Sequence, residues 1–113
     1  TKGKPAAAGS KEGETIDLWQ LEDNIKQNNT YFLVETNYDR TVPAPKGDDR
    51  RDPAMKCMQE LGPANFGIEG LFNVLNGKPN LNRLTVFSTL MHAKTGRMES
   101  YRMYCVGLDC PFF

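Results

Sequence analysis

The chain has 113 residues, and its 14 basic and 14 acidic residues give a formal net charge of zero at pH 7. A chain of this length forms one domain or part of one, and its apolar fraction of 39% is low for a self-sufficient globule. The balanced charge excludes a global field that would attract nucleic acid or an anionic membrane, and no apolar run reaches membrane-spanning length.

The first segment, residues 1–14, is rich in Lys, Gly, Ala, Ser and Glu and predicts a flexible tail before a folded part over 15–113. The start looks truncated or processed, and a secretory leader could have been removed with an upstream segment. A free N-terminal threonine can be a nucleophile. Thr1, however, opens a tail rather than a core strand, so we assign it no catalytic role.

Two strands are predicted next, over 15–21 and 30–36, joined by a polar turn over 22–29. The continuous apolar run at 31–34 favours a central strand that is covered on both faces. We expect these strands to form an antiparallel hairpin that delivers Asn37 to one edge or end of a sheet.

The second half predicts two helices and a second hairpin. Pro43, Pro45 and Gly47 make the segment 40–49 a loop, after which Asp52 is expected to cap a helix. The expected elements are a helix from Asp52 to Leu61, a helix over 68–76, and paired strands over 84–93 and 97–104. The fold class is therefore α+β, with antiparallel strands in the order β-β-α-α-β-β.

Asn37 and Arg50 are the candidate site residues. The amide of Asn37 donates hydrogen bonds without titrating, and the guanidinium of Arg50 is a permanent charge with a rigid fork of donors. An acyl-transfer site needs such groups around its developing oxyanion. The chemistry alone leaves an ordinary alternative open, in which Asn37 forms a turn and Asp48 to Arg51 are a solvated ion-pair cluster.

The cysteines and one sequon bear on the compartment. Cys105 and Cys110 enclose four residues, which suits a small disulfide loop, although two free thiols of a cytosolic protein are the alternative. Asn28 begins an Asn-Asn-Thr sequon between the predicted strands and is a candidate glycosylation site. Together these features favour a secreted or lysosomal protein. The single histidine leaves a zinc site incomplete, so we expect no metal and no cofactor.

The sequences of three motifs resemble those of a known family. Val34-Glu35-Thr36-Asn37-Tyr38-Asp39, Pro43-Ala44-Pro45-Lys46 and Asp48-Asp49-Arg50-Arg51 closely resemble the acid ceramidase family and its sister, the N-acylethanolamine-hydrolysing acid amidases. The resemblance runs from about Ile16 to the end. It implies the C-terminal part of the β-subunit of an N-terminal-nucleophile cysteine hydrolase, a partial αββα sandwich. The nucleophilic cysteine would lie upstream, so this segment alone is expected to be inactive.

The resemblance also assigns roles to individual residues. Asn37 matches the asparagine of the oxyanion hole, and Arg50 matches an arginine near the nucleophile. Arg51 and Asp48 are expected to hold their loop by ion pairs. Cys57 matches a cysteine that pairs with the small α-subunit in ceramidases.

The same comparison leaves the substrate open. The amidase sister lacks the cysteines matched by Cys57, Cys105 and Cys110, whereas the motifs at 34–37 and 43–46 read more like the amidase. A ceramide-like lipid amide, cleaved to fatty acid and sphingosine, is the expected substrate. N-acylethanolamine hydrolysis, and a catalytically silent fragment or secreted binding module, are the alternatives.

The expected partners follow from the resemblance. They are the upstream α-subunit and the N-terminal part of the β-subunit, and a membrane surface or lipid activator is a further candidate. Nucleic acid is not expected.

Overall fold

The computed structural model describes residues 6–10 and 16–112. Its described part is α+β, as predicted, with three α-helices, one short 3-10 helix and two antiparallel sheets of two strands each. The chain divides into two compact units, residues 1–45 and 46–113, each of which we describe by itself.

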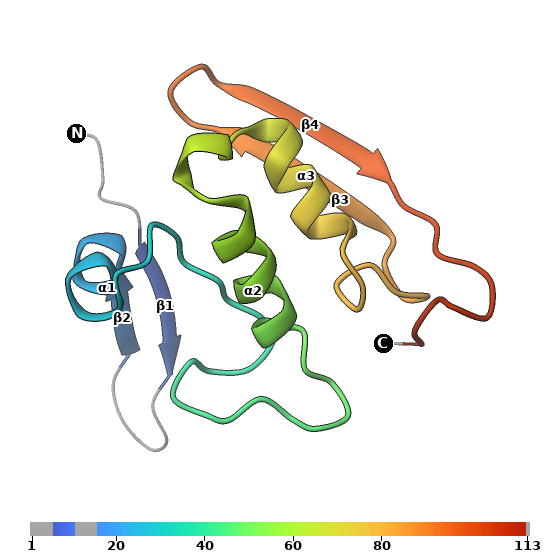
Figure 1. Ribbon diagram of the computed structural model, residues 1–113, viewed down its shortest axis with the longest axis horizontal. Coiled ribbons are helices and arrows are strands. Elements are labelled where there is room, and N and C mark those ends of the chain that lie inside the picture. The colour runs from blue at the N-terminus through green and yellow to red at the C-terminus, as the bar shows by residue number, and fades with distance from the viewer. Residues whose placement is uncertain (1–5, 11–15, 113) are drawn as a thin grey trace. The chain divides into compact units, whose positions relative to one another are not determined.

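The first unit begins with two paired strands. β1 (Ala6–Ser10) is antiparallel to β2 (Ile16–Gln20), and α1 (Leu21–Asn28) follows β2 without a break (Figure 1). The strand predicted over 15–21 is therefore present, but its partner lies in the segment 1–14, for which we predicted a flexible tail. The predicted pairing with residues 30–36 is wrong.

α1 replaces the turn predicted over 22–29. The polar composition concealed a helix whose Asn24 is buried at 5% exposure, where its Nδ2 donates to the carbonyl of Phe32 over 2.9 Å and also to the hydroxyl of Thr30. Asn29 caps the C-terminal end of the helix in a left-handed conformation at φ 52°, which asparagine tolerates. A buried amide thus fixes α1 against the next segment.

The segment 30–36 is not a strand, although a strand was predicted there. Phe32 is buried at 6% exposure and meets the ring of Tyr31 edge-on at 5.1 Å. Of the apolar run only Phe32 is buried, and the other three residues are half-buried, so the predicted cover on both faces is absent. The side chain of Asn24 satisfies the Phe32 carbonyl, which a sheet neighbour would otherwise pair.

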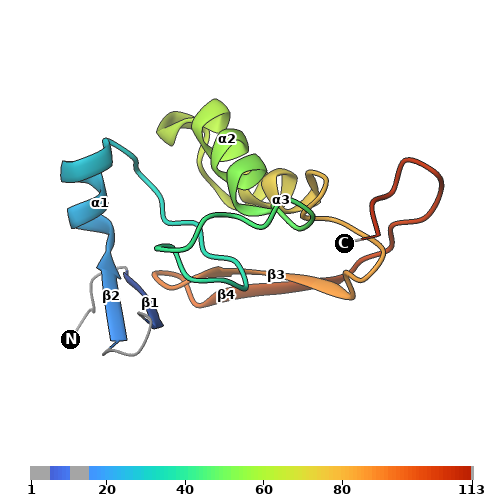
Figure 2. The same cartoon turned by 90° about the horizontal axis from the view of Figure 1, so that it is seen from below.

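The second unit contains two helices and a hairpin. The helices are α2 (Arg51–Leu61) and α3 (Ile68–Asn76), with the short η1 (Pro63–Asn65) between them. The strands are β3 (Phe87–His92) and β4 (Arg97–Arg102), with Leu90 opposite Glu99. Both helices lie on one side of the hairpin (Figure 2). The two helices and the hairpin confirm the prediction for this half, although both strands are shorter than expected.

Leu90 is the centre of this unit, at 1% exposure, and α3 packs on both β3 and α2. Ala54, Met58 and Val74 are buried with it. Gly70 is required where α3 passes η1, because a Cβ there would come within 2.7 Å of the Asn65 carbonyl oxygen. The opposite face of the hairpin leaves three large apolar side chains exposed, those of Phe87, Met91 and Met98.

α2 begins one residue earlier than predicted, and Asp52 is not its cap. Arg50 occupies the N-cap position, and the Oδ1 of Asp49 accepts a hydrogen bond from the backbone N–H of Asp52 over 3.0 Å. Asp52 lies in the first turn, where a carboxylate is favoured by the helix dipole. None of the helices in the described part of the chain has the length and apolarity that a membrane span needs.

Candidate functional site

Asn37 lies in a bend after the segment 30–36 and is exposed. We predicted that Asn37 ends a strand covered on both faces. No strand forms at residues 30–36, so Asn37 is not held by a sheet. A turn follows at once, closed by a hydrogen bond from the Val42 N–H to the Asp39 carbonyl over 3.0 Å. The neighbouring hydroxyl of Thr36 is buried and has no hydrogen-bond partner among the described residues.

A cation–π contact ties the Asn37 motif to β2. The guanidinium carbon of Arg40 lies 5.2 Å from the centre of the Trp19 ring. Contacts of this kind contribute about 0.5–1 kcal/mol at exposed sites. The turn that follows Asn37 is therefore anchored to the sheet of the first unit by a side chain rather than by strand pairing.

Arg50 lies at the start of α2 in the second unit and forms a two-pronged ion pair with Asp48. Its Nε is 2.9 Å from Asp48 Oδ1, and its Nη2 is 3.2 Å from Oδ2. Both side chains are about one quarter exposed (28% and 26%). Two parallel hydrogen bonds fix the plane of the guanidinium as well as its position.

Arg51 behaves differently from its neighbour. Its Nε lies 4.0 Å from Asp52 Oδ1, at the limit of an ion pair, and its side chain is only 15% exposed. We predicted that Asp48 and Arg51 both hold the loop by ion pairs. The structure gives Asp48 a close partner, Arg50, and the contact between Arg51 and Asp52 is a long one.

The sequon lies at the end of α1 rather than between two strands. Asn28 is exposed, and its Nδ2 donates to the Asn24 side-chain oxygen over 2.6 Å. The hydroxyl of Thr30, the third sequon residue, accepts from Asn24. The candidate glycosylation site is therefore at the surface, next to the buried amide that fixes α1.

The cysteines are arranged as expected within this chain. Cys105 and Cys110 form a disulfide with their Cα atoms 5.8 Å apart, and Cys57 is a free, half-buried thiol on α2. No group of three metal-binding side chains occurs among residues 6–10 and 16–112.

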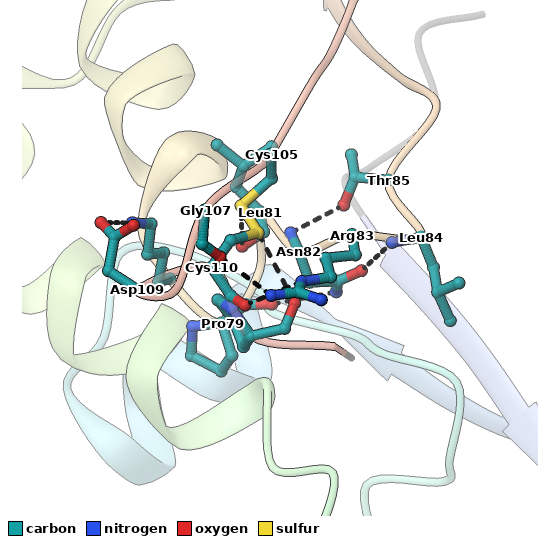
Figure 3. Close-up of a disulfide and its surroundings, with 12 residues drawn as sticks. Pro79, Leu81, Asn82, Arg83, Leu84, Thr85, Cys105, Gly107, Asp109 and Cys110 are labelled. Atoms are coloured by element: carbon teal, nitrogen blue, oxygen red, sulfur yellow. Dashed lines mark hydrogen bonds and ion pairs between the residues drawn. A yellow bond between two sulfur atoms is a disulfide. The ribbon is translucent and has the colours of Figure 1, made fainter.

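Sequence reasoning missed the side chains that hold the disulfide loop, residues 105–110. Arg83 donates to the Gly107 carbonyl over 2.9 Å and to the Cys110 carbonyl over 3.3 Å (Figure 3). Lys78 forms a 2.6 Å ion pair with Asp109, which lowers the pKa of that carboxyl through the hydrogen bond and the charge of the lysine. These partners are 24 to 31 residues apart, so no local pattern indicates them.

It also missed an open groove of about 590 Å³ between α3 and the hairpin. There the Tyr101 hydroxyl donates to Glu99 over 2.8 Å, and Arg97 pairs with the same carboxylate. The hydrogen bond from Tyr101 is the main cause of a lowered pKa of Glu99, and Arg97 adds to it. The same hydrogen bond raises the pKa of Tyr101.

No family model matches the chain. Among curated proteins, the chain is similar to an N-acylethanolamine-hydrolyzing acid amidase of Cavia porcellus, with 42% identity over 93 residues. The aligned residues make up 82% of this chain and 25% of that protein. The chain is 38% identical over 98 residues to an acid ceramidase of Mus musculus (87% and 23%), and 43% identical over 77 residues to a probable acid ceramidase of Caenorhabditis elegans (68% and 19%). The chain spans about a fifth to a quarter of the length of these relatives and matches a C-terminal part of them.

Proposed function

Because this chain belongs, over the segment that aligns, to the family of acid ceramidases and N-acylethanolamine-hydrolyzing acid amidases, we propose that it is the C-terminal part of the β-subunit of a lysosomal lipid amidase. The amidase cleaves N-acyl sphingoid lipids to a fatty acid and sphingosine. The observation that carries the proposal is identity of 38% or more over more than four fifths of the chain to relatives of both names.

Asn37 supplies one donor of the oxyanion hole. In the reaction, a cysteine thiolate upstream of this chain attacks the amide carbonyl, and the carbonyl oxygen becomes an oxyanion. The Asn37 amide donates a hydrogen bond to that oxygen. The C–N bond breaks, the amine leaves with a proton, and the acyl group stays on the cysteine as a thioester. Water then attacks the thioester, which releases the fatty acid and regenerates the thiol. The exposure of Asn37 supports this role, since a donor must reach substrate.

Arg50 supplies positive charge beside the nucleophile. A guanidinium there favours the thiolate over the thiol and draws the reacting amide into a polar site. The two hydrogen bonds from Arg50 to Asp48 support this assignment, because they hold its fork in one plane before substrate binds. Arg51 takes no part in the chemistry, because the spacing from Asn37 matches Arg50 to the arginine that the family places near the nucleophile.

The N-terminal-nucleophile sandwich is the proposed whole fold. Two helices on one side of an antiparallel hairpin, as in the second unit, are compatible with one α-layer and one β-layer of an αββα arrangement. The exposed apolar face of the hairpin, which carries Phe87, Met91 and Met98, supports a second sheet packed against it in the complete protein.

Cys57 and Asn28 carry the proposed processing features. The half-buried thiol of Cys57 forms a disulfide with the upstream α-subunit, and the exposed Asn28 carries a glycan. Both features, with the disulfide between Cys105 and Cys110, support a lysosomal or secreted location.

N-acylethanolamine hydrolysis is the second candidate function. The 42% identity to an N-acylethanolamine-hydrolyzing acid amidase favours it, and the disulfide loop favours the ceramidase through the resemblance of its cysteines. The test is to offer the complete protein an N-acylsphingosine and an N-acylethanolamine with the same acyl chain and to compare kcat/KM. A higher value for the N-acylsphingosine is expected, and a reversed ratio assigns the protein to the second function.

The 113-residue chain alone is proposed to be inactive. The purified chain is incubated with a fluorogenic fatty amide beside the complete protein, and release above the buffer blank is expected only from the complete protein. Activity of the chain that is lost on changing Thr1→Ala would contradict our view of Thr1.

A further inference from the structure

The disulfide loop, residues 105–110, presents apolar side chains to solvent. Leu108 is fully exposed, and Val106 is 83% exposed. Tyr104, just before the loop, and Phe112, just after it, are 69% and 62% exposed. Within the second unit the loop projects beyond the open end of the hairpin (Figure 2). An exposed apolar cluster of this kind marks a contact surface.

The loop is held in shape from two sides. The disulfide closes it covalently, and the guanidinium of Arg83 donates to two of its carbonyls, those of Gly107 and Cys110 (Figure 3). The ion pair between Lys78 and Asp109 adds a third point of attachment for the loop. The apolar side chains are therefore presented at little further cost in conformational entropy.

The surroundings of the loop are cationic. An open hollow of about 470 Å³ is lined by Arg83 together with Val106, Leu108 and the first cysteine. The segments 78–86 and 102–112 contain three cationic residues (Lys78, Arg83 and Arg102) and one acidic residue, Asp109. Arg102 lies over the ring of Tyr104, with its guanidinium carbon 5.3 Å from the ring centre. Apolar side chains beside guanidinium groups and an aromatic ring suit the boundary between lipid headgroups and acyl chains.

We propose that the disulfide loop is a docking element for an anionic lipid bilayer, in which Val106 and Leu108 enter the acyl region while Arg83 and Arg102 meet the headgroup phosphates. The positive charge of this end is complementary to an anionic surface. The biological reason for docking rests on the proposed function, because a lipid amidase must take its substrate from a membrane or a micelle. Docking itself needs no amide substrate.

The test uses the complete protein and vesicles without any amide lipid. One set is phosphatidylcholine alone, and the other contains phosphatidylserine as well. The double variant Val106→Ser/Leu108→Ser is compared with Leu18→Ser/Ile25→Ser, which removes two exposed apolar residues (60% and 45%) from the first unit. The loop variant is expected to lose affinity for the anionic vesicles by at least about tenfold, and the control variant to keep it. Unchanged binding by the loop variant overturns the proposal.

A fluorescence measurement locates the contact. Leu108→Trp and Ile25→Trp each add one indole to the complete protein, and the change relative to the unsubstituted protein is recorded with brominated lipids. A blue shift and quenching at position 108 but not at position 25 are expected. An indole at position 108 that is already shielded in dilute protein without lipid overturns the proposal, because the loop is then covered by the rest of the polypeptide. Shielding that grows with protein concentration overturns it in favour of a second copy.

Hydrolysis of a water-soluble fluorogenic amide is measured on the same samples. A loop variant that fails to bind vesicles yet keeps this activity supports docking separately from catalysis. Loss of vesicle binding together with loss of this activity, in a variant that melts at an unchanged temperature, overturns the assignment of the loop to docking alone. Failure of the proposed amidase function leaves the vesicle result intact, so the two failures are distinguishable.

Discussion

Arg50 and Asp48 are joined by two nearly parallel hydrogen bonds, of 2.9 and 3.2 Å, at the point where the loop enters α2. The two residues are separated by one position, and both are partly shielded from solvent. The pair therefore sets the orientation of the guanidinium before any substrate arrives, and it makes Asp48 a positioning residue for the proposed active site.

The first prediction concerns this positioning. Changing Asp48→Ala in the complete enzyme should lower kcat by about tenfold, because hydrogen bonds to charged groups contribute about 1.5–3 kcal/mol and Arg50 then samples other orientations. KM should change little. Asp49→Ala is the matched control, since Asp49 accepts a hydrogen bond from the first turn of α2. It should cost about 1 kcal/mol of stability and leave kcat near normal. Equal losses of kcat in both variants would show a general effect on the loop.

The second prediction separates the two arginines. Arg50→Lys should lose most of the activity, because a lysine keeps the charge but cannot form two parallel bonds with one carboxylate. Arg51→Ala should be milder than Arg50→Ala, because the family resemblance places Arg50, and not Arg51, near the nucleophile. Steady-state kinetics of the three variants decide this, after self-cleavage of each has been confirmed on a gel. An Arg51→Ala variant that is the more damaged of the two alanine variants would contradict the assignment.

Local patterns predicted the second unit well. Residues 68–76 form the predicted helix with the same bounds, because the glycines on either side and the apolar spacing act within a few residues. The hairpin was found for the same reason, since its turn is the local sequence Lys94-Thr95-Gly96. Elements whose boundaries are encoded by neighbouring residues are accessible to sequence reasoning.

The first unit was predicted less well because its stabilising contacts are not encoded locally. Asn24 reads as a turn residue, and its hydrogen bonds to Thr30 and Phe32, which lie outside the helix, are not indicated by the local pattern. The apolar run at 31–34 reads as a strand, but the segment is fixed by a side-chain amide. The same limit applies to Arg83, whose partners lie in the disulfide loop. Asn37 and Arg50 were selected by the chemistry of their side chains and by the sequence of their motifs. The neighbouring residues alone do not distinguish a catalytic residue from a turn residue at either position.

The third prediction concerns the cysteines. Peptide mapping without reduction should recover Cys105 linked to Cys110, and Cys57 linked to a peptide from outside this chain. On a non-reducing gel, Cys57→Ser should release a second polypeptide from the processed protein, whereas Cys105→Ser/Cys110→Ser should not. A peptide in which Cys57 is joined to Cys105 or Cys110 is the result that contradicts the pairing.

The fourth prediction is a pH dependence in the groove between α3 and the hairpin. The hydrogen bonds from Tyr101 and Arg97 lower the pKa of Glu99. Their stabilising effect is therefore fully present above the ordinary pKa of a glutamate, and it is lost as the pH falls through the lower pKa of the folded state. Tyr101→Phe should raise the pKa of Glu99 towards its ordinary value, which a ¹³C NMR titration of the carboxyl measures.

Tyr104→Phe is the matched control for that titration. Tyr104 follows strand β4, is exposed, and contacts Arg102 rather than a carboxylate. Its removal should leave the pKa of Glu99 unchanged. An identical titration of Glu99 in Tyr101→Phe and in the unsubstituted protein would show that the tyrosine hydroxyl does not control this carboxyl.

The most direct test of the account measures kcat and KM of the complete, processed protein and of its Asn37→Ala variant on a fluorogenic fatty amide. Loss of one oxyanion donor typically costs on the order of 3 kcal/mol in the transition state, so kcat should fall by about a hundredfold or more. KM should barely change, because the hydrogen bond strengthens only as charge develops on the carbonyl oxygen. Near-normal kcat in a fully processed Asn37→Ala variant would contradict the account and leave Asn37 as a turn residue.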